Sequence, residues 1–476
     1  MMTELIESDY LVIGAGGMGM AFADEILSHT DATITIVDRN HRPGGHWNDA
    51  YPFVRLHQAS VCYGVNSMQL GEHSVDQVGL NRGCYELASG SEVVAYFDTV
   101  MRKRFLPSGR VRYLPMCEFD KSAGKAVSRM CGTEYEFRYN KIVDATYLNV
   151  TVPSQRGPDF QVMDGVRAVA VNELPKVAPE HDNFVLVGSG KTGMDAALFL
   201  LTNGVIPERI TWIMPADAWM FDRFDVNPGR KFSDPIAKYA IGILESALEA
   251  EDYDDFFERL VERKLVMQLD PSVKPTRWRC ATFTPLELEQ LRRVKNVVRK
   301  GYLLTAGPCE MTLASGKHPT PHNAVFVDCA ADGLPKVPEV KVFDGNRITL
   351  QTLRMCQQVY SAGFIGNVEA NIDADEDRKN ELTQPVPLPY TDDDYLRCAI
   401  QNSKNMAVWL TEPAVVDWIN KARTDLFSPL LDFSCPETAA NIQAMGQLIE
   451  AAVPKMQELL KQAPPKKADV KMVATA

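Results

Sequence analysis

The chain has 476 residues, of which 45% are hydrophobic and 24% are charged, and it carries a formal net charge of −12 at pH 7. These values are ordinary for a globular protein, and the length favours two or three domains with ample core. The acidic balance argues against a general basic surface, so we expect no nucleic-acid partner and no binding to an anionic membrane.

Leader segments, apolar runs and cysteine spacing bear on the compartment. No leader-like pattern precedes the first predicted strand, and no run of about 18 apolar residues occurs, so we expect a cytoplasmic protein without a transmembrane helix. The ten cysteines are scattered, and no two of them have the spacing C-x-x-C. We therefore expect free, mostly buried thiols, no metal site and no dithiol redox pair.

The stretch 10–38 is the most informative part of the chain. An apolar run at Tyr10–Ile13 predicts a buried strand, a helical pattern follows it, and a β-branched run at Thr33–Val37 predicts a second strand that ends at Asp38. This order predicts one βαβ unit. Asp38 follows Gly19 by 19 residues, which is close to the spacing at which an acid binds a ribose.

Three glycines of this unit, Gly14, Gly16 and Gly19, form the pattern G-x-G-x-x-G. The first allows a tight turn, the second lets the backbone approach a pyrophosphate, and the third lets the helix pack against the strand. The N–H groups at the helix N-terminus attract phosphate. With both strands and the acid in place, the pattern predicts a dinucleotide site; the alternative is a tight glycine turn without a ligand.

The region up to residue 150 gives weaker signals. His57 lies in a loop, where it could assist proton transfer or hold a structural hydrogen bond. The predicted elements are a helix over 91–106 capped by Ser91, a β-meander over Val111–Phe119 and Glu134–Tyr139, and a buried strand that ends over 142–146.

A second G-x-G-x-x-G pattern lies at 188–193, between an apolar run at Phe184–Val187 and a helical run at Met194–Leu201. Ile210–Met214 is the predicted second strand, so a second dinucleotide site is expected. The spacing is not that of a Walker A loop, G-x-x-x-x-G-K-[ST]. Neither an arginine nor an acid stands at Met214, and the sequence therefore leaves the choice between NADPH and NADH open.

The second half of the chain is mostly helical in pattern. The apolar face of 233–267 could be core or a wall of a substrate site. The predicted elements are amphipathic helices over 233–267, a basic and aromatic strand at 276–280, a strand at 327–333, a helix within 355–368, an acidic, proline-rich loop at 373–393, and helices over 393–424 and 436–461.

The order of these signals resembles that of the flavin-containing monooxygenase and Baeyer–Villiger monooxygenase superfamily over residues 8–370. The resemblance rests on both glycine patterns, the Gly44-Gly45-His46-Trp47 loop, the Ala145-Thr146 segment and the return segment 327–333. It implies an α/β fold with two Rossmann-like dinucleotide-binding domains, for FAD and NAD(P), a helical insertion and a helical C-terminal region. The implied division is an FAD-binding domain in two parts, 1–152 and 326–390, an NAD(P)H-binding domain at 153–325 with an insertion at about 230–300, helices at 391–462 and a disordered tail at 463–476.

The same resemblance implies cofactors and residue roles. FAD is expected at the first glycine pattern and NADPH at the second, with NADH as the alternative. Asn66 resembles the asparagine beside the flavin ring and is a catalytic candidate together with His57; a turn asparagine is the alternative. The implied cofactor-binding residues are Gly14, Gly16, Gly17, Met18, Gly19, Asp38, Arg39, Gly45, His46, Trp47, Cys117, Thr146, Gly188, Ser189, Gly190, Lys191, Thr192 and Gly193.

The implied reaction is a monooxygenation of a small organic substrate by O2 through a flavin C4a-(hydro)peroxide. The superfamily's F-x-G-x-x-x-H pattern has no clear match in the chain. An FAD-dependent NAD(P)H oxidoreductase or oxidase without oxygen insertion is therefore the alternative, and an FAD-holding scaffold is a third. The missing C-x-x-C argues against a disulfide reductase of this fold. The substrate and the oligomeric state, including a homo-oligomer, stay open.

Overall fold

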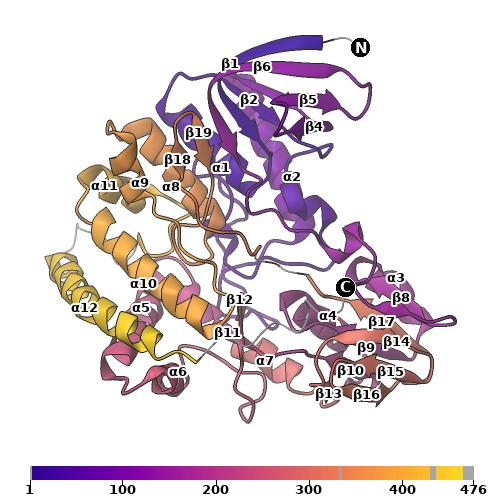
Figure 1. The fold of residues 1–476 in the computed structure, drawn as a ribbon. Helices are drawn as coiled ribbons and strands as arrows, with labels where there is room; N and C mark the ends of the chain where they lie inside the picture. The colour runs from indigo at the N-terminus through magenta and orange to yellow at the C-terminus, as the bar shows by residue number, and fades with distance from the viewer. Residues whose placement is uncertain (1–2, 332, 334, 429–435, 465–476) are drawn as a thin grey trace.

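The computed structural model describes residues 3–331, 333, 335–428 and 436–464, with the backbone alone at 436–442. Two mainly parallel sheets and a group of helices form the molecule, which confirms the predicted fold class. In Figure 1 the first sheet is at the top, the second sheet is at the lower right, and the helical group is at the lower left. The described part of the chain has no helix that is both long and apolar enough to cross a bilayer.

The first sheet contains the first glycine pattern. Its strand order is β18-β19-β6-β1-β2-β3, and β4 and β5 extend it from β6. The strands are β1 (Thr3–Ile13), β2 (Ile34–Val37), β3 (Val111–Leu114), β4 (Cys117–Asp120), β5 (Lys125–Ser128), β6 (Glu134–Asp144), β18 (Phe343–Asp344) and β19 (Arg347–Thr349). Its helices are α1 (Gly17–His29), α2 (Gly90–Val100) and α8 (Gln358–Asn371).

The second sheet contains the second glycine pattern and is parallel throughout, with the order β13-β10-β9-β17-β8. A small four-stranded sheet of order β16-β15-β14-β7 accompanies it. The elements are β7 (Gln161–Val162), β8 (Arg167–Ala170), α3 (Leu174–Val177), β9 (Asn183–Val187), α4 (Lys191–Thr202), β10 (Ile210–Ile213), α7 (Pro285–Leu291), β13 (Val297–Val298), β14 (Leu303–Ala306), β15 (Glu310–Leu313), β16 (Gly316–Pro319) and β17 (Ala324–Asp328).

The helical group joins the insertion in the second unit to the C-terminal region. One hydrophobic cluster contains side chains of α5, α6, α10 and α12, together with Trp219 and Trp278 from the two-stranded sheet of β11 and β12. The elements are β11 (Ala218–Asp222), α5 (Ser233–Glu249), α6 (Tyr253–Glu262), β12 (Arg277–Phe283), α9 (Glu376–Leu382), α10 (Asp392–Trp409), α11 (Pro413–Lys421) and α12 (Pro436–Lys461). The predicted helices over 233–267 therefore pack mostly in core, and Tyr239 of α5 also borders the cavity described below.

Local capping corrects two predictions. The first helix after residue 89 is capped by Ser89, not by Ser91, because Ser89 and Glu92 form a reciprocal capping box. The segment 373–393, predicted as a loop, contains α9, whose first turn is held by the Asp375 carboxylate accepting from the N–H of Arg378 at 2.9 Å.

Strand pairing corrects two more. The predicted meander holds for β4, β5 and β6, but β3 pairs with β2 in parallel. The strand β17, which we expected to begin the return to the first domain, pairs with β8 and β9 in the second sheet. The chain returns to the first sheet at β18 and β19. Of the tail predicted to be disordered, residues 465–476 lie outside the described residues.

Candidate functional site

The first glycine pattern forms a turn between β1 and α1. Gly14 has φ +105°, which only glycine adopts readily. Gly16 is the N-cap of α1, with φ −78° and ψ −179°. A Cβ on Gly19 would lie 2.0 Å from the carbonyl oxygen of Gly14, so the helix can approach the strand this closely only with glycine there.

The second glycine pattern repeats this geometry between β9 and α4. Gly188 has φ +124°, and the N-cap Gly190 has φ −80° and ψ −177°. A Cβ on Gly193 would lie 2.2 Å from the carbonyl oxygen of Gly188. The indole N–H of Trp212, in β10, donates to that same carbonyl at 2.9 Å. The two turns therefore have matching backbone conformations and matching close approaches.

The two turns differ in what covers them. A Cβ on Gly45 would lie 2.9 Å from the Cα of Gly16, and the N–H of Gly44 donates to the carbonyl of Ala15 at 2.9 Å. The 44–45 loop thus covers the first turn, backbone against backbone. At Gly190, by contrast, an added Cβ would meet no described atom within 4 Å. The two turns therefore differ in the atoms that lie against their N-cap glycines, Gly16 and Gly190.

Asp38 is buried and holds the first turn in place. One carboxylate oxygen accepts from the N–H of Ala15 at 2.6 Å, and the other accepts from the N–H of Asn40 at 2.6 Å. Burial raises the pKa of this carboxyl above its usual value, and the two backbone hydrogen bonds partly oppose that rise. In the structure Asp38 therefore binds the turn's own backbone at the position where we expected a ribose contact.

The structure brings several other predicted residues to the first turn. A Cβ on Gly17 would lie 2.9 Å from Val359 of α8 and 3.1 Å from the hydroxyl of Tyr63. That hydroxyl accepts from the indole N–H of Trp47 at 2.7 Å. The methyl group of Thr146 would lie 3.1 Å from a Cβ on Gly14.

Four predicted residues near this turn lie in different surroundings. Met18 belongs to the core around α1. His46 is exposed beside Trp47, and Arg39 is exposed after β2. Cys117 belongs to a hydrophobic cluster with side chains of β1, β2 and β3. Its thiol donates to the carbonyl of Pro115 at 3.4 Å. The side chain of Cys117 is thus part of the core.

The second turn carries a polar group that sequence reasoning missed. The ammonium of Lys191 contacts both carboxylate oxygens of Asp195 at 2.5 Å. The hydroxyl of Tyr51, from the first half of the chain, donates to the same carboxylate at 2.6 Å. The i,i+4 spacing of Lys191 and Asp195 is visible in the sequence, but nothing in the sequence points to Tyr51. Ser189 and Thr192 are half-buried beside this group.

The side chains after β10 do not select between the two coenzymes. Met214, at the position expected to read the ribose, is fully buried. Asp217 is bound in two places by the guanidinium of Arg299, at 2.8 and 2.9 Å. This acid is therefore already engaged.

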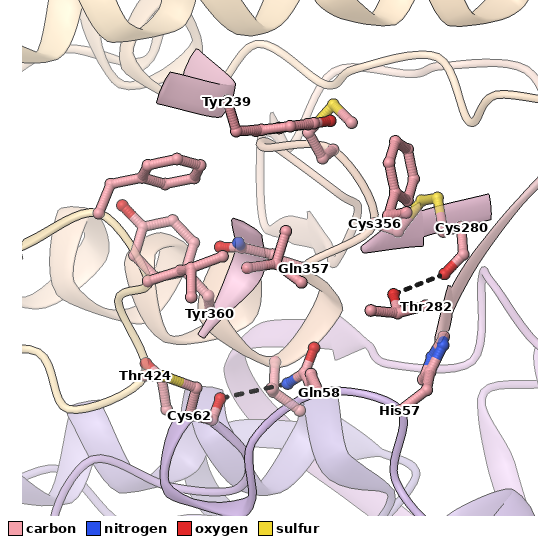
Figure 2. A pocket seen from close by; sticks show the side chains of 16 residues that line it. His57, Gln58, Cys62, Tyr239, Cys280, Thr282, Cys356, Gln357, Tyr360 and Thr424 are labelled. Atoms are coloured by element: carbon pink, nitrogen blue, oxygen red, sulfur yellow. Dashed lines mark hydrogen bonds between the residues drawn. A yellow bond between two sulfur atoms is a disulfide. The ribbon is translucent and has the colours of Figure 1, made fainter. Parts of the chain in front are cut away.

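A cavity of about 100 Å³ lies where the first unit, the insertion in the second unit and the segment after α11 meet. Figure 2 shows that segments far apart in the sequence contribute to it. The residues that line it are His57, Gln58, Cys62, Phe221, Val226, Tyr239, Cys280, Thr282, Met355, Cys356, Gln357, Val359, Tyr360, Thr424, Leu426 and Phe427. Of the two catalytic candidates, His57 borders this cavity.

Electrostatics keep His57 neutral. Burial lowers its pKa to about 3, and the positive charges of Lys191 and Arg223 add to that effect. Its Nδ1 is buried and has no hydrogen-bond partner among the described residues. His57 therefore borders the cavity as a neutral ring with one buried nitrogen that is unpaired within the described part of the chain.

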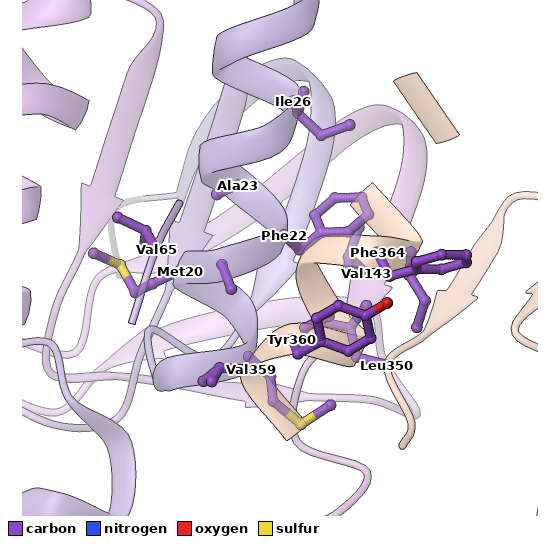
Figure 3. Close-up of a cluster of buried hydrophobic side chains, with 14 of the residues drawn as sticks. Met20, Phe22, Ala23, Ile26, Val65, Val143, Leu350, Val359, Tyr360 and Phe364 are labelled. Atoms are coloured by element: carbon purple, nitrogen blue, oxygen red, sulfur yellow. The ribbon is translucent and has the colours of Figure 1, made fainter. Parts of the chain in front are cut away.

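The helix α8 connects the cavity to the first turn. Its first residues, Val359 and Tyr360, line the cavity, and Val359 also reaches Gly17. Figure 3 shows Val359, Tyr360 and Phe364 beside Phe22 and Ile26 of α1. The N-terminus of α8 therefore points toward the space between the first turn and the cavity, where its dipole favours negative charge.

Asn66, the other catalytic candidate, is engaged at both ends of its carboxamide. Its Nδ2 donates to Glu25 of α1 at 2.6 Å. Its Oδ1 accepts from the N–H of Thr424 at 3.1 Å and from the hydroxyl of Thr424 at 2.9 Å. Glu25 also accepts from the indole of Trp418. Asn66 therefore links α1 to the segment after α11.

One prediction about the cysteines was wrong. Cys280 and Cys356 form a disulfide, with their Cα atoms 6.5 Å apart and a sequence separation of 76. Both line the cavity. The expectation of free thiols came from the absence of a short spacing, and a pair this far apart leaves no spacing signal.

Comparison with solved structures returns flavoenzymes at low similarity. A flavin-containing monooxygenase from Stenotrophomonas maltophilia is 18% identical, covers 72% of this chain and 84% of its own, and has a TM-score of 0.40. An oxidized steroid monooxygenase bound to NADP is 13% identical, with coverages of 94% and 98% and a TM-score of 0.44. A complex of OTEMO with FAD and NADP is 14% identical, with coverages of 91% and 98% and a TM-score of 0.45. The fold assignment rests on the sheet topology and not on these scores.

No protein-family model matches the chain. Among curated proteins, the uncharacterized protein Rv2000 of Mycobacterium tuberculosis and the uncharacterized protein Mb2023 of Mycobacterium bovis are each 46% identical to it over 428 residues. The alignment spans 90% of this chain and 79% of each relative. The chain therefore belongs to the family of these mycobacterial proteins.

Proposed function

We propose that this protein is an FAD-dependent, NAD(P)H-using monooxygenase that acts on a small organic substrate with O2. The observation that carries the proposal is the pair of glycine turns with matching φ, ψ and close approaches, on two parallel sheets. One such turn is compatible with a single nucleotide. Two in one chain support a bound redox cofactor and a coenzyme that reacts with it.

The 44–45 loop covers the first turn and has no counterpart among the described atoms at Gly190, and this difference supports FAD at the first turn and the nicotinamide coenzyme at the second. The first turn is covered by this loop, and Trp47, Tyr63 and Val359 lie beside it. That suits FAD, which stays bound. The second turn is open at Gly190, which suits a coenzyme that enters and leaves. NADPH is the proposed coenzyme on the superfamily resemblance, with NADH as the alternative.

The residues present fit these groups. Each helix N-terminus offers N–H groups that have no acceptor within the helix, and glycines keep Cβ atoms away from the approach. Lys191, at the start of α4, adds a positive charge beside the second turn. Asp38 holds the first turn by accepting a hydrogen bond from the N–H of Ala15. A remaining lone pair on its carboxylate would accept from a ribose hydroxyl.

The chain's own residues have definable tasks around the reaction. Bound flavin would supply hydride acceptance from the nicotinamide and reaction with O2. Apolar side chains such as Phe221, Val226 and Leu426 exclude water from the cavity. His57 borders the cavity as a neutral imidazole. The contacts of Asn66 suit a positioning role, in which it holds the 63–67 segment against α1 and Thr424.

A second candidate function is an NAD(P)H oxidoreductase without oxygen insertion. The specific observation in its favour is the disulfide in the cavity wall, since a disulfide is a two-electron acceptor that needs no O2. Oxygen-isotope labelling separates the two. Incorporation of one atom of ¹⁸O₂ into the substrate, coupled to NAD(P)H consumption, supports the monooxygenase. Consumption with hydrogen peroxide as the only oxygen product supports the oxidoreductase.

The visible spectrum of the purified protein tests the cofactor assignment. The protein should be yellow and should bleach anaerobically on addition of NADPH or NADH. Gly16→Val should lose the flavin, because the larger side chain intrudes where the backbone approaches the pyrophosphate. Gly190→Val should keep the flavin and lose bleaching by the nucleotide. A Gly16→Val protein with full flavin content, or a Gly190→Val protein that bleaches at the normal rate, would refute the site assignment.

A further inference from the structure

The disulfide between Cys280 and Cys356 lies in the wall of the cavity. Figure 2 shows it on the same side as Thr282 and His57. Cys280 comes from β12, which is part of the insertion in the second unit, and Cys356 comes from the segment just before α8 of the first unit. Cys280 is 8% exposed and Cys356 is half-buried, so the cavity gives access to the bridge.

The backbone at Cys280 departs from a regular strand. In the parallel pairing of β11 and β12, Trp219 pairs with Trp278 but the next residue, Met220, pairs with Ala281. Arg279 and Cys280 therefore form a bulge in β12. Bulges redirect side chains and are frequent beside active sites. This one directs Cys280 to the cavity.

The local conformation on each side of the bridge is unusual for its residue type. Cys280 has φ +49°, and Met355, which precedes Cys356, has φ +43°. Non-glycine residues adopt this left-handed region only at an energetic cost, and such residues cluster at functional sites. A bridge that only tied two segments together would not require such conformations on both sides.

We infer that Cys280 and Cys356 are a redox-active pair that opens to two thiols by taking up an electron pair in this cavity. The inference rests on the proposed function, because the electron pair comes from NAD(P)H by way of the bound cofactor. The balance is one disulfide, one hydride equivalent from NAD(P)H and one proton from solvent, giving two thiols and NAD(P)⁺. The S–S bond breaks, and each sulfur gains one electron and one proton.

The pair gives the cavity a second two-electron acceptor besides O2. Cys356 precedes α8, whose Val359 lines the cavity and reaches the first glycine turn, so the bridge adjoins the helix that links the cavity to the proposed flavin site. Cys356 is one residue from Gln357 and three from Val359. Electron uptake at the bridge would also free β12 from the segment before α8.

Differential thiol labelling of the flavin-loaded protein tests this inference. The protein is mixed anaerobically with NADPH, and separately with NADH, then unfolded in N-ethylmaleimide and analysed by peptide mass spectrometry. We expect two more labelled thiols per chain than without nucleotide, at Cys280 and Cys356. Cys309, an exposed free thiol, is an internal control that should be labelled equally in every sample.

The outcomes separate this inference from the proposed function. If the flavin bleaches and the two cysteines stay unlabelled, the inference is overturned and the proposed function stands. If neither nucleotide bleaches the flavin, the proposed function fails, and dithionite-reduced methyl viologen then serves as the donor. Labelling of both cysteines by that donor supports a redox pair fed from another source, and no labelling overturns it.

Serine variants give a second readout. In an anaerobic reductive titration, Cys280→Ser and Cys356→Ser should each take up one electron pair fewer per chain than the wild type, whereas Cys309→Ser should match it. Flavin content checks that each variant is folded. Equal uptake by the wild type and the folded serine variants would refute the inference; if the variants do not fold, the wild-type labelling decides alone.

Discussion

A Cβ on Gly19 would lie 2.0 Å from the carbonyl oxygen of Gly14, and a Cβ on Gly193 would lie 2.2 Å from the carbonyl oxygen of Gly188. Gly19→Ala and Gly193→Ala should each destabilise the fold by about 3 kcal/mol or more, since a backbone carbonyl cannot yield as a side chain can. Thermal unfolding measures the loss. Gly190→Ala is the matched control: it has the same change in an open position with φ −80°, and should lie close to wild type. A normal melting temperature for Gly193→Ala would contradict the packing described for the second turn.

Asn66 should prove to be a structural link. Asn66→Ala removes three hydrogen bonds and leaves Glu25 and Thr424 short of partners. We expect a loss of about 2–4 kcal/mol in the free energy of unfolding, measured by urea denaturation. Asn140→Ala, which removes an exposed hydrogen bond to Asp9, is the control and should cost less than about 1 kcal/mol. Unchanged stability with abolished turnover would instead assign Asn66 to the chemistry.

The low pKa of His57 should make stability fall in mild acid. The folded pKa is about 3 and the ordinary value is 6.5, so between these values the unfolded chain binds the proton and protonation favours unfolding. From pH 7 to pH 5 this contributes a loss of about 2 kcal/mol. His57→Gln should remove that part of the loss, and His41→Gln, an exposed histidine, should not.

Asp225 complicates the raw pH profile, so the comparison must be between variants. Burial, with a contribution from Asp222, raises its pKa to about 7. The folded chain then binds the proton between about pH 4 and pH 7, and stability rises as the pH falls through this range. This effect opposes that of His57. If wild type and His57→Gln lose the same free energy between pH 7 and pH 5, the assignment of a low pKa to His57 is wrong.

The buried ion pair of Arg354 with Asp425 should be sensitive to removal of one partner. Both side chains are almost completely buried, and the guanidinium also lies 3.7 Å from the ring centre of Tyr360 in α8. Asp425→Asn should cost about 3–5 kcal/mol, because it leaves a buried charge uncompensated. The exposed pair of Lys421 with Asp417 provides the control, and Asp417→Asn should change the free energy of unfolding by less than about 1 kcal/mol. Equal effects of the two substitutions in urea denaturation would contradict this account.

Local patterns predicted the glycine turns, while long-range contacts escaped prediction. The spacing of Gly14, Gly16 and Gly19 encodes a conformation that one short stretch largely determines, so the sequence predicts the turn and the βαβ unit that contains it. The Ser89 to Glu92 capping box was equally visible in the spacing and was misplaced by two residues. Capping is a local signal with several near-equal candidates.

The long-range contacts around the second turn and the cavity depend on the tertiary fold. Tyr51 reaches Asp195, Asn66 reaches Thr424, and Cys280 reaches Cys356 across stretches of chain that carry no period linking them. The placement of β17 in the second sheet was missed for the same reason, since an apolar run does not say which sheet it joins.

The two sheets differ in when their strands leave the ribosome. All five strands of the second sheet lie within 167–328, whereas the first sheet needs β1 from the start of the chain and β19 at Arg347–Thr349, and α1 needs α8 up to Asn371. The second sheet can therefore close before β18 and β19 complete the first sheet and before α8 covers α1. At ordinary translation rates the 43 residues from 328 to 371 take roughly 2–9 s. During that interval α8 does not yet cover Phe22 and Ile26 of α1, and these apolar side chains are exposed to association with other chains.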